Sequence, residues 1–165
     1  KKKNKKIKIL KIKNEKEEKL LRQKTKEIEI PLDLKIKKII PEMKEIMKKN
    51  DGVGLSANQI GLPWRFFVAE YQNKSYVLIN PKILKHSKKI ILAEEGCLSV
   101  PNFVGLVSRY ESIIIEAFNS NNKKIKIKAK NMLARIFQHE IDHLDGIIFT
   151  DKAKKIYQIN NKNEK

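Results

Sequence analysis

The chain has 165 residues, of which 41% are hydrophobic and 34% are charged. This length suits one domain with its own core, and no apolar run approaches the roughly 18 to 20 residues of a membrane-spanning helix. The formal net charge is +18, but only four of the 37 basic residues are arginines. Because nucleic-acid readers usually enrich arginine, we interpret the lysine excess mainly as codon-biased composition rather than specific nucleic-acid binding. Attraction to a polyanionic surface such as the ribosome is compatible with this charge.

The N-terminus and the cysteine content bear on the origin of the protein. The chain opens with KKKNKKIKIL, which has neither an initiator Met nor the apolar stretch of a secretory signal, so we expect a mature or trimmed form. Cys97 is the single cysteine. An internal disulfide is therefore excluded, which suits a reducing compartment.

The first half of the chain predicts a strand, a helix and a loop. Residues 7–12 alternate as a strand would, whereas the charged residues 14–30 are expected to lie on the surface. Residues 31–52 predict an amphipathic helix with Asp33 as its N-cap, a bend or break at Pro41, and Gly52 after its end. Its expected apolar stripe is Leu34, Ile39, Ile40, Met43 and Met47. Residues 52–63 predict a glycine-bounded loop.

The second half predicts mainly strands and one further helix. Strands are expected at 64–71, 76–84 and 88–96, and a hairpin from 104–119 and 123–130 around NSNN. Asn131 is expected to cap a helix that Gly146 ends, and residues 152–159 to form a short C-terminal helix. The predicted class is therefore α+β, a single domain (1–165) with antiparallel strands around one buried helix. Residues 1–30 form a basic N-terminal segment, and 151–165 a C-terminal helix or tail.

The stretch FQHEIDHLDG carries the main chemical signal. His139 and His143 lie four residues apart on the predicted helix, so both imidazoles can reach one metal ion. Glu140 follows the first histidine and can approach a metal-bound water without ligating the metal. The alternative is a polar helix face without any metal.

Two further stretches supply candidate partners. EEGCLSVP places Cys97 on a turn between strands, and a thiolate with two imidazoles would leave one tetrahedral position open; the alternative is a buried, inert thiol. In GVGLSANQ the glycines permit close backbone approach and Gln59 offers an amide, although they could simply cap the preceding helix.

These three stretches, in this order, resemble the peptide deformylase family. Its signatures are a Gly-Φ-Gly-Φ-Ala-Ala-x-Gln loop, a Glu-Gly-Cys-Φ-Ser turn and a Gln-His-Glu-x-Asp-His helix (Φ being apolar). They correspond here to GVGLSANQ (52–59), EGCLS (95–99) and QHEIDH (138–143), and the single departure is Ser56, where the family has Ala. Arg109 in VSRYESIIIEA also fits a family arginine. The first 30 residues are rich in lysine and match the family pattern poorly.

The resemblance implies removal of the N-formyl group from nascent peptides that begin with formylmethionine, which releases formate. Cys97, His139 and His143 would bind the metal, which lowers the pKa of bound water toward ~7. Glu140 would take the proton of that water and later deliver it to the departing amine. The backbone N–H of Leu98 and the side-chain amide of Gln59 would stabilise the developing oxyanion.

The substrate site can be outlined from the same helix. Met132, Arg135 and Ile136 lie seven, four and three residues before His139, on its face, and would line an apolar pocket for the methionine side chain. Val53 and Leu98 would lie opposite, and the backbone of Gly54 would pair with the peptide as a strand does. Alternatively, Met132 and Ile136 are simply core residues. Glu95 and Asp142 are the candidate hydrogen-bond partners of the histidine ligands.

The metal and the alternative functions remain open at this stage. A sulfur and two nitrogens would favour Zn²⁺ from ligand type alone, whereas the resemblance implies Fe²⁺, with Zn²⁺, Ni²⁺ or Co²⁺ as substitutes. One alternative is a zinc endopeptidase, although those generally recruit a third His or Glu. Another is a basic RNA- or ribosome-binding module with a structural metal.

Location and partners follow from the proposed chemistry. Formylmethionine starts translation in bacteria, mitochondria and plastids, and the biased composition favours an organelle, a plastid or apicoplast, over a bacterial cytoplasm. The expected partners are nascent formyl-Met peptides and, through the basic charge, the ribosome surface. Neither a membrane nor a specific nucleic-acid sequence is expected.

Overall fold

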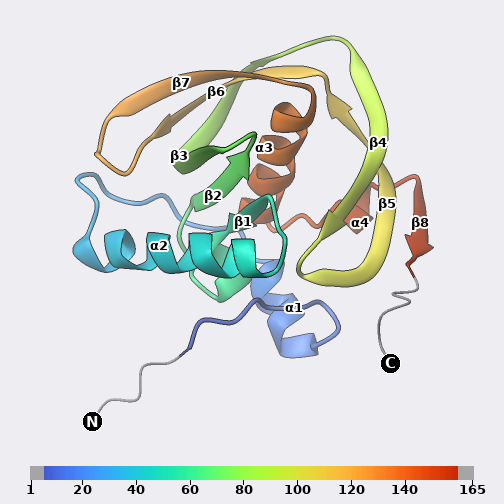
Figure 1. Ribbon diagram of the computed structural model, residues 1–165, viewed down its shortest axis with the longest axis horizontal. Coiled ribbons are helices and arrows are strands. Elements are labelled where there is room, and N and C mark those ends of the chain that lie inside the picture. The colour runs from blue at the N-terminus through green and yellow to red at the C-terminus, as the bar shows by residue number, and fades with distance from the viewer. Residues whose placement is uncertain (1–5, 160–165) are drawn as a thin grey trace.

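Helix α3 (Asn131–Leu144) packs against two antiparallel sheets in the computed structural model, which describes residues 6–159 (Figure 1). The larger sheet has the strand order β1-β2-β3-β6-β7 and the smaller one β4-β5-β8. The strands are β1 (Gly54–Ser56), β2 (Phe66–Tyr71), β3 (Lys74–His86), β4 (Ile90–Cys97), β5 (Val100–Tyr110), β6 (Ser112–Phe118), β7 (Lys124–Lys130) and β8 (Lys155–Gln158). The other helices are α1 (Glu15–Leu21), α2 (Leu34–Lys49), the 3₁₀-helix η1 (Ala57–Ile60) and α4 (Phe149–Lys152). The predicted α+β class with a buried helix is confirmed.

Different helices cover the two faces of the larger sheet. Ile113 and Ile115 of β6 face the core that contains α3, whereas Met43 and Met47 of α2 pack on the opposite face. Alternating side chains let one strand serve both layers. Helix α3 is therefore enclosed, and its polar residues have to find partners inside the protein. Within residues 6–159, no helix is both long and apolar enough to cross a bilayer.

Helix α2 follows the sequence prediction with two differences. The side chain of Asp33 accepts a hydrogen bond from the backbone N–H of Lys35, as an N-cap does. Pro41 does not break the helix, which continues to Lys49 and is held on the sheet by its buried stripe. That stripe begins with Ile36, because Leu34 points outward with 70% of its surface exposed.

The N-terminal segment differs from its prediction. Residues 7–12 are not a strand, yet Leu10 donates a backbone hydrogen bond to Gln59 O and Ile12 donates one to Ser99 O. Residues 14–30 are not merely superficial, because they include α1, whose Leu21 is fully buried. The apolar residues scattered among the charges decide the burial of this segment.

The predicted hairpin of residues 104–119 and 123–130 was also wrong in part. The chain turns at Glu111, so that β5 pairs with β4 in the smaller sheet, while β6 and β7 form the hairpin. Asn131 is not the helix cap: Lys130 holds that position, and the backbone N–H of Asn131 donates to Glu111 O.

The predicted C-terminal helix at 152–159 was wrong. Helix α4 ends at Lys152, and the following residues form β8, which pairs with β5 from Phe103 to Leu106. Strand pairing at a long sequence distance overrides the local pattern here. The part of the predicted tail after residue 159 lies outside the described residues.

Candidate metal centre and substrate cavity

Helix α3 and the end of β4 bring three metal-ligating side chains together. The Nε2 atoms of His139 and His143 are 3.2 Å apart, as expected for residues one helical turn apart. Cys97, the last residue of β4, places its Sγ 3.1 Å from Nε2 of His143. All three ligand atoms lie within 4.8 Å of one another. The structure therefore brings together the three predicted ligands.

This cluster fits a tetrahedrally coordinated divalent cation. With metal–nitrogen and metal–sulfur distances of about 2.0 and 2.3 Å, ligand atoms on one ion lie roughly 3.3 to 3.6 Å apart, close to the separations found here. The ligands come from two elements and enclose the position from one side, because the cavity described below opens on the other. A structural metal with four protein ligands would have no such opening.

The two histidines respond in opposite ways to their surroundings. Burial alone would lower the pKa of His139, but hydrogen bonds with Cys97 and Glu95 raise it well above the usual value. Burial, and then the neighbouring His139, lower the pKa of His143 well below that value. The pair therefore competes for one proton, which a cation would displace on binding.

Glu140 lies beside the ligands without joining them. Its Oε1 is 3.9 Å from Nε2 of His139, and its buried Oε2 has no hydrogen-bond partner among the described residues. Burial raises the pKa of Glu140 to about 7, which suits a group that exchanges protons near neutral pH. A Cβ on Gly54 would lie 2.9 Å from the Glu140 carboxyl carbon. The motif therefore requires glycine at position 54 to leave room for Glu140.

Gln59 is held so that its amide nitrogen faces the metal ligands. Its Oε1 accepts hydrogen bonds from the backbone N–H and the hydroxyl of Ser56. Its Nε2 donates to Ser99 Oγ at 3.0 Å and lies 3.5 Å from Cys97 Sγ. Ser56, where the loop departs from the family pattern, thus adds a hydrogen bond that Ala could not. The roles of Ser56 and Ser99 were not recognised in the sequence, although both lie inside the motifs.

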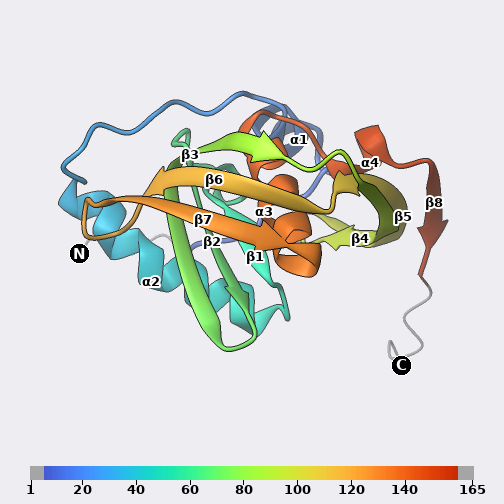
Figure 2. The same cartoon turned by 90° about the horizontal axis from the view of Figure 1, so that it is seen from above.

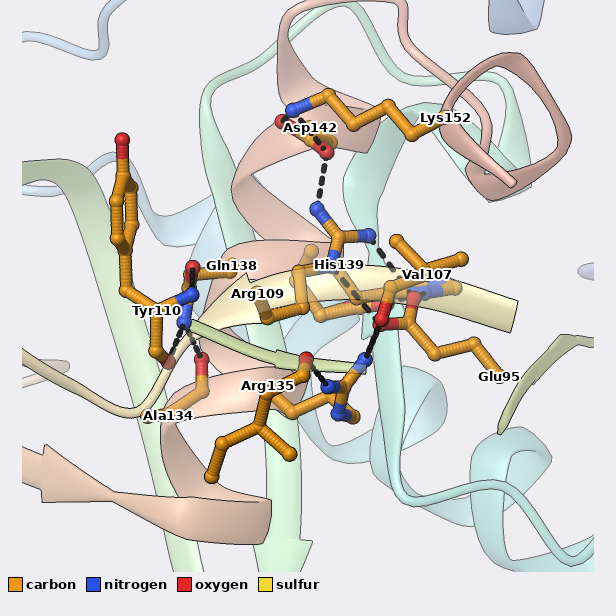
Figure 3. Close-up of polar contacts among 12 residues, drawn as sticks. Glu95, Val107, Arg109, Tyr110, Ala134, Arg135, Gln138, His139, Asp142 and Lys152 are labelled. Atoms are coloured by element: carbon orange, nitrogen blue, oxygen red, sulfur yellow. Dashed lines mark hydrogen bonds and ion pairs between the residues drawn. The ribbon is translucent and has the colours of Figure 1, made fainter. Parts of the chain in front are cut away.

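A buried ion-pair cluster contacts Nδ1 of the ligand His139, on the other side of the ring from Nε2, which faces His143 (Figure 3). It consists of Glu95, Arg109, Arg135 and Asp142. Glu95 Oε1 lies 2.8 Å from Nδ1 of His139, so Glu95 is the predicted partner of this ligand. Asp142, the other candidate, contacts Arg109 and Lys152 instead.

Two arginines fix the carboxylate of Glu95. Arg109 reaches it through Nε and Nη2, at 2.8 and 2.9 Å, and Arg135 through Nη1, at 2.6 Å. Burial alone would raise the pKa of Glu95, but the hydrogen bonds from Arg109 and His139 lower it well below its usual value. An ionised Glu95 accepts a hydrogen bond from Nδ1–H of His139 and leaves Nε2 free to ligate a cation.

A cavity of about 330 Å³ opens over these residues, within the range of small-ligand sites. Its walls include all the predicted substrate residues, Val53, Gly54, Met132, Arg135 and Ile136, and also Leu98. Val53 and Met132 are about half exposed, at 51% and 46%, and are available to a ligand. Ile136 is mostly buried in the core.

Arg135 lines the cavity and also has a second role that the sequence did not indicate. Its Nη1 also donates to Val107 O and its Nη2 to Ile91 O, so the guanidinium ties β4 and β5 to Glu95. The residue therefore borders the cavity while its charge is neutralised elsewhere. Helix spacing indicated its face but not this role, because the partners come from distant strands.

Comparison with known proteins agrees with this geometry. The chain matches the sequence model of the polypeptide deformylase family over residues 7–158. The peptide deformylase of Symbiobacterium thermophilum is 43% identical over 148 residues, which are 88% of this chain and 67% of that protein. The chloroplastic peptide deformylase 1B of Solanum lycopersicum is 41% identical over 81% of this chain, which spans about half (49%) of that relative.

A solved structure shares the fold as well as the sequence. The peptide deformylase from Thermotoga maritima superimposes with a TM-score of 0.84 at 34% identity, covering 90% of this chain and 98% of that one. The matched family range includes residues 7–30, which belong to the segment expected to match the family poorly. The chain therefore belongs to the peptide deformylase family, whose members are metal-dependent hydrolases that remove the N-formyl group from nascent peptides.

Proposed function

We propose that Cys97, His139 and His143 hold the divalent cation with which this chain hydrolyses N-terminal formyl-methionyl peptides. The observation that carries the proposal is the convergence of these three ligand atoms beside a cavity. When bound, the cation would act as a Lewis acid that lowers the pKa of a ligand water and polarises the formyl oxygen. The other steps depend on side chains and backbone groups of the chain itself.

Glu140 moves the proton in this mechanism. Its Oε2 is buried and unpaired among the described residues, so it can accept a hydrogen bond from the attacking water. With a pKa of about 7, the carboxylate can take that proton and return it to the amine as the C–N bond breaks. Formate and a free amino terminus are the products.

Gln59 and Leu98 stabilise the oxyanion in this mechanism. The Gln59 amide is fixed by Ser56 and Ser99, so its N–H groups need no reorganisation as negative charge develops. Leu98 directly follows Cys97 and lines the cavity, so its backbone N–H can serve as the second donor. Both donors lie next to a ligand in space or in sequence.

The cavity walls would select the methionine side chain. Val53 and Met132 offer exposed apolar surface, with Leu98 and Ile136 beside them, and an unbranched thioether packs well in such an irregular apolar site. Gly54 lies at the start of β1, where its backbone can pair with an extended peptide. Arg135 contributes the stem of its side chain to the wall.

We assign Fe²⁺ as the working ion, with Zn²⁺, Ni²⁺ or Co²⁺ as substitutes. A site with one sulfur and two nitrogens accepts any of these ions, and a protein without disulfides suits a compartment in which ferrous iron persists. Elemental analysis of protein purified without oxygen should find iron at the level of one ion per chain. A preparation that holds zinc alone under these conditions would contradict the assignment.

Formate release from a formyl-Met tripeptide tests the proposed activity. We expect release that a chelator abolishes, and no cleavage of an unformylated internal peptide, which a zinc endopeptidase would cut. Gln59→Leu should lower kcat about 10²- to 10³-fold, while elemental analysis shows an unchanged metal content. Equal kcat values for Gln59→Leu and the parent would remove Gln59 from the mechanism.

We further propose that the protein works in an organelle with bacterial-type translation, a plastid or apicoplast, and meets nascent chains at the ribosome. The inflated lysine, asparagine and isoleucine content supports the first point and the charge of +18 the second. The alternative is a bacterial cytoplasm, and relatives come from both a bacterium and a plant chloroplast. Antibody labelling of source cells distinguishes these compartments.

A further inference from the structure

Six lysines form one basic surface on the larger sheet, and none of them lines the cavity beside the metal ligands. Every second residue of β7 is a lysine (Lys124, Lys126, Lys128 and Lys130), and all four are exposed. Lys82 and Lys85 of β3 lie on the same face, because each is separated from a β7 lysine only by one residue of β6. We call these six residues the lysine face. Figure 2 shows β3, β6 and β7 lying side by side.

This face is open because α2 covers only part of the sheet. The core beneath α2 takes buried side chains from β1, β2 and β3 and none from β7. The intervening β7 residues Ile125, Ile127 and Ala129 point to the other side, against the core that contains α3. The side chains of Lys124, Lys126 and Lys128 therefore lie on the side of the sheet opposite to the α3 core, and Lys130 stands where β7 leads into α3.

The charge of the lysine face is almost uncompensated. Glu116 of β6 is the one acidic residue between the two rows of lysines, and it forms an ion pair with Lys124 at 2.6 Å. Among residues 6–159, the other five lysines form no ion pair. The hydrogen bond from Lys124 lowers the pKa of Glu116, and the charges of Lys126 and Lys82 act in the same direction.

We propose that the lysine face binds the phosphate backbone of RNA. Alternate residues of a strand lie roughly 6.6 to 6.8 Å apart, so β7 presents a row of regularly spaced lysines to a linear array of phosphates. Lysine acts as a point charge that contacts phosphates, whereas base reading usually depends on arginine, asparagine or glutamine. Binding should therefore be insensitive to RNA sequence.

The shape of the face favours a nucleic acid over a membrane. Peripheral membrane binding needs large apolar side chains that enter the headgroup region beside the basic ones. The apolar neighbours on this face, Ile114 and Phe118, are partly buried between the lysine rows. A hollow of about 190 Å³ has Lys85, Lys128 and Lys130 in its lining, beside His86. It offers a position where one phosphate can lie next to basic residues of both β3 and β7.

Fluorescence anisotropy with a labelled duplex RNA of arbitrary sequence tests the proposal. If all six lysines contact phosphates, the slope of log K against log [salt] should be about −5, so affinity falls about 10³-fold between roughly 50 and 200 mM salt. Lys126→Gln, Lys128→Gln and Lys130→Gln together should reduce the slope by about three. The affinity of this variant for RNA should then fall only about 10- to 30-fold over the same salt range.

The matched control changes the same net charge elsewhere. Lys13, Lys16 and Lys24 are exposed residues in and around α1 and form no ion pair within residues 6–159. Their triple Gln variant should retain the parent slope. Equal effects of the two triple variants would overturn the proposal, because total charge would then be responsible. Binding to phosphatidylserine vesicles but not to RNA would also overturn it.

The hydrolytic function provides an independent readout. Both triple variants should release formate from a formyl-Met tripeptide at the parent rate, because none of the substituted lysines lines the cavity. The lysine face does not depend on the proposed catalytic mechanism. If the protein releases formate but does not bind RNA, only the proposal for the lysine face is wrong. If it binds RNA but does not release formate, only the proposed function is wrong.

Discussion

The metal-ligand cluster and the buried ion-pair cluster meet at His139, but they differ in how completely their polar atoms are paired. In the ion-pair cluster every buried charge has a partner, and Glu95 alone accepts hydrogen bonds from Arg109, Arg135 and His139. Among the metal ligands and the adjacent Glu140, by contrast, Glu140 Oε2 and His143 Nδ1 have no hydrogen-bond partner among the described residues. Saturated groups hold a fixed geometry, whereas unsaturated buried groups retain capacity for a ligand. We therefore expect the ion-pair cluster to contribute mainly to stability, and the metal ligands with Glu140 to contribute mainly to catalysis.

The largest expected effect comes from Glu140→Gln, which removes the ionisable group from the unsaturated cluster. The amide keeps the shape but cannot accept a proton, so kcat should fall about 10²- to 10⁴-fold. Formate release measures the effect, and elemental analysis should show the parent metal content, because Glu140 is not a proposed ligand. Substantial remaining activity would mean that another group takes the proton.

Arg109→Met should mainly reduce stability, because it breaks the saturated cluster. The variant leaves Glu95 and Asp142 with fewer partners, and removing one member of a buried ion pair costs roughly 3 to 5 kcal/mol. Urea unfolding measures this loss. Lys152→Met is the matched control: Lys152 also pairs with Asp142, but its side chain is 45% exposed, so the cost should be at most about 1 kcal/mol. Similar losses for the two variants would contradict the distinction between the clusters.

The smallest expected effect is the pH dependence of stability that Glu140 causes. Its pKa is about 7 in the folded protein against 4.5 for an ordinary glutamate. The folded state therefore binds this proton more tightly, and stability decreases as pH rises from about 4.5 to about 7. Each pKa unit corresponds to about 1.36 kcal/mol, so the total is roughly 3 kcal/mol.

Chelator-treated protein isolates this contribution from that of a metal. Urea unfolding across this pH range should show Glu140→Gln gaining stability relative to the parent as pH rises. The two curves should converge below pH 4.5, where the parent carboxyl is protonated in both states. If the free energy of unfolding of the two proteins changed with pH in parallel, burial would not raise the pKa of Glu140.

The sequence predicted that His139 and His143 lie together, because their geometry is local. A helix with its fixed period places His139 and His143 on one face regardless of the remaining fold. The position of Cys97 depended on the motif, because only β4 carries it to the helix. The hydrogen bonds of Ser99 to Gln59 and of Arg135 to Glu95 could not be predicted, since the partners are 40 residues apart in each case.

The difference between local and long-range contacts also explains which parts of the fold were predicted wrongly. Asp33 caps α2 through a hydrogen bond to Lys35, two residues away, which a local pattern reveals. The local pattern of residues 155–158 suggested a helix, and pairing with the distant β5 makes them a strand instead. The turn at Glu111 was missed because residues 107–118 contain neither glycine nor proline to mark it, although β5 and β6 belong to different sheets.

The backbone contacts of the N-terminal segment also matter for the design of shortened proteins. The backbone N–H of Leu10 donates a hydrogen bond to Gln59 O and that of Ile12 donates one to Ser99 O. One stretch of chain therefore clasps the two segments whose side chains, Gln59 and Ser99, are hydrogen-bonded beside Cys97. A truncation that removes residues through Ile12 would free these segments together, even though it deletes no residue of the three motifs. Crystallisation or inhibitor-screening versions should begin upstream of this clasp.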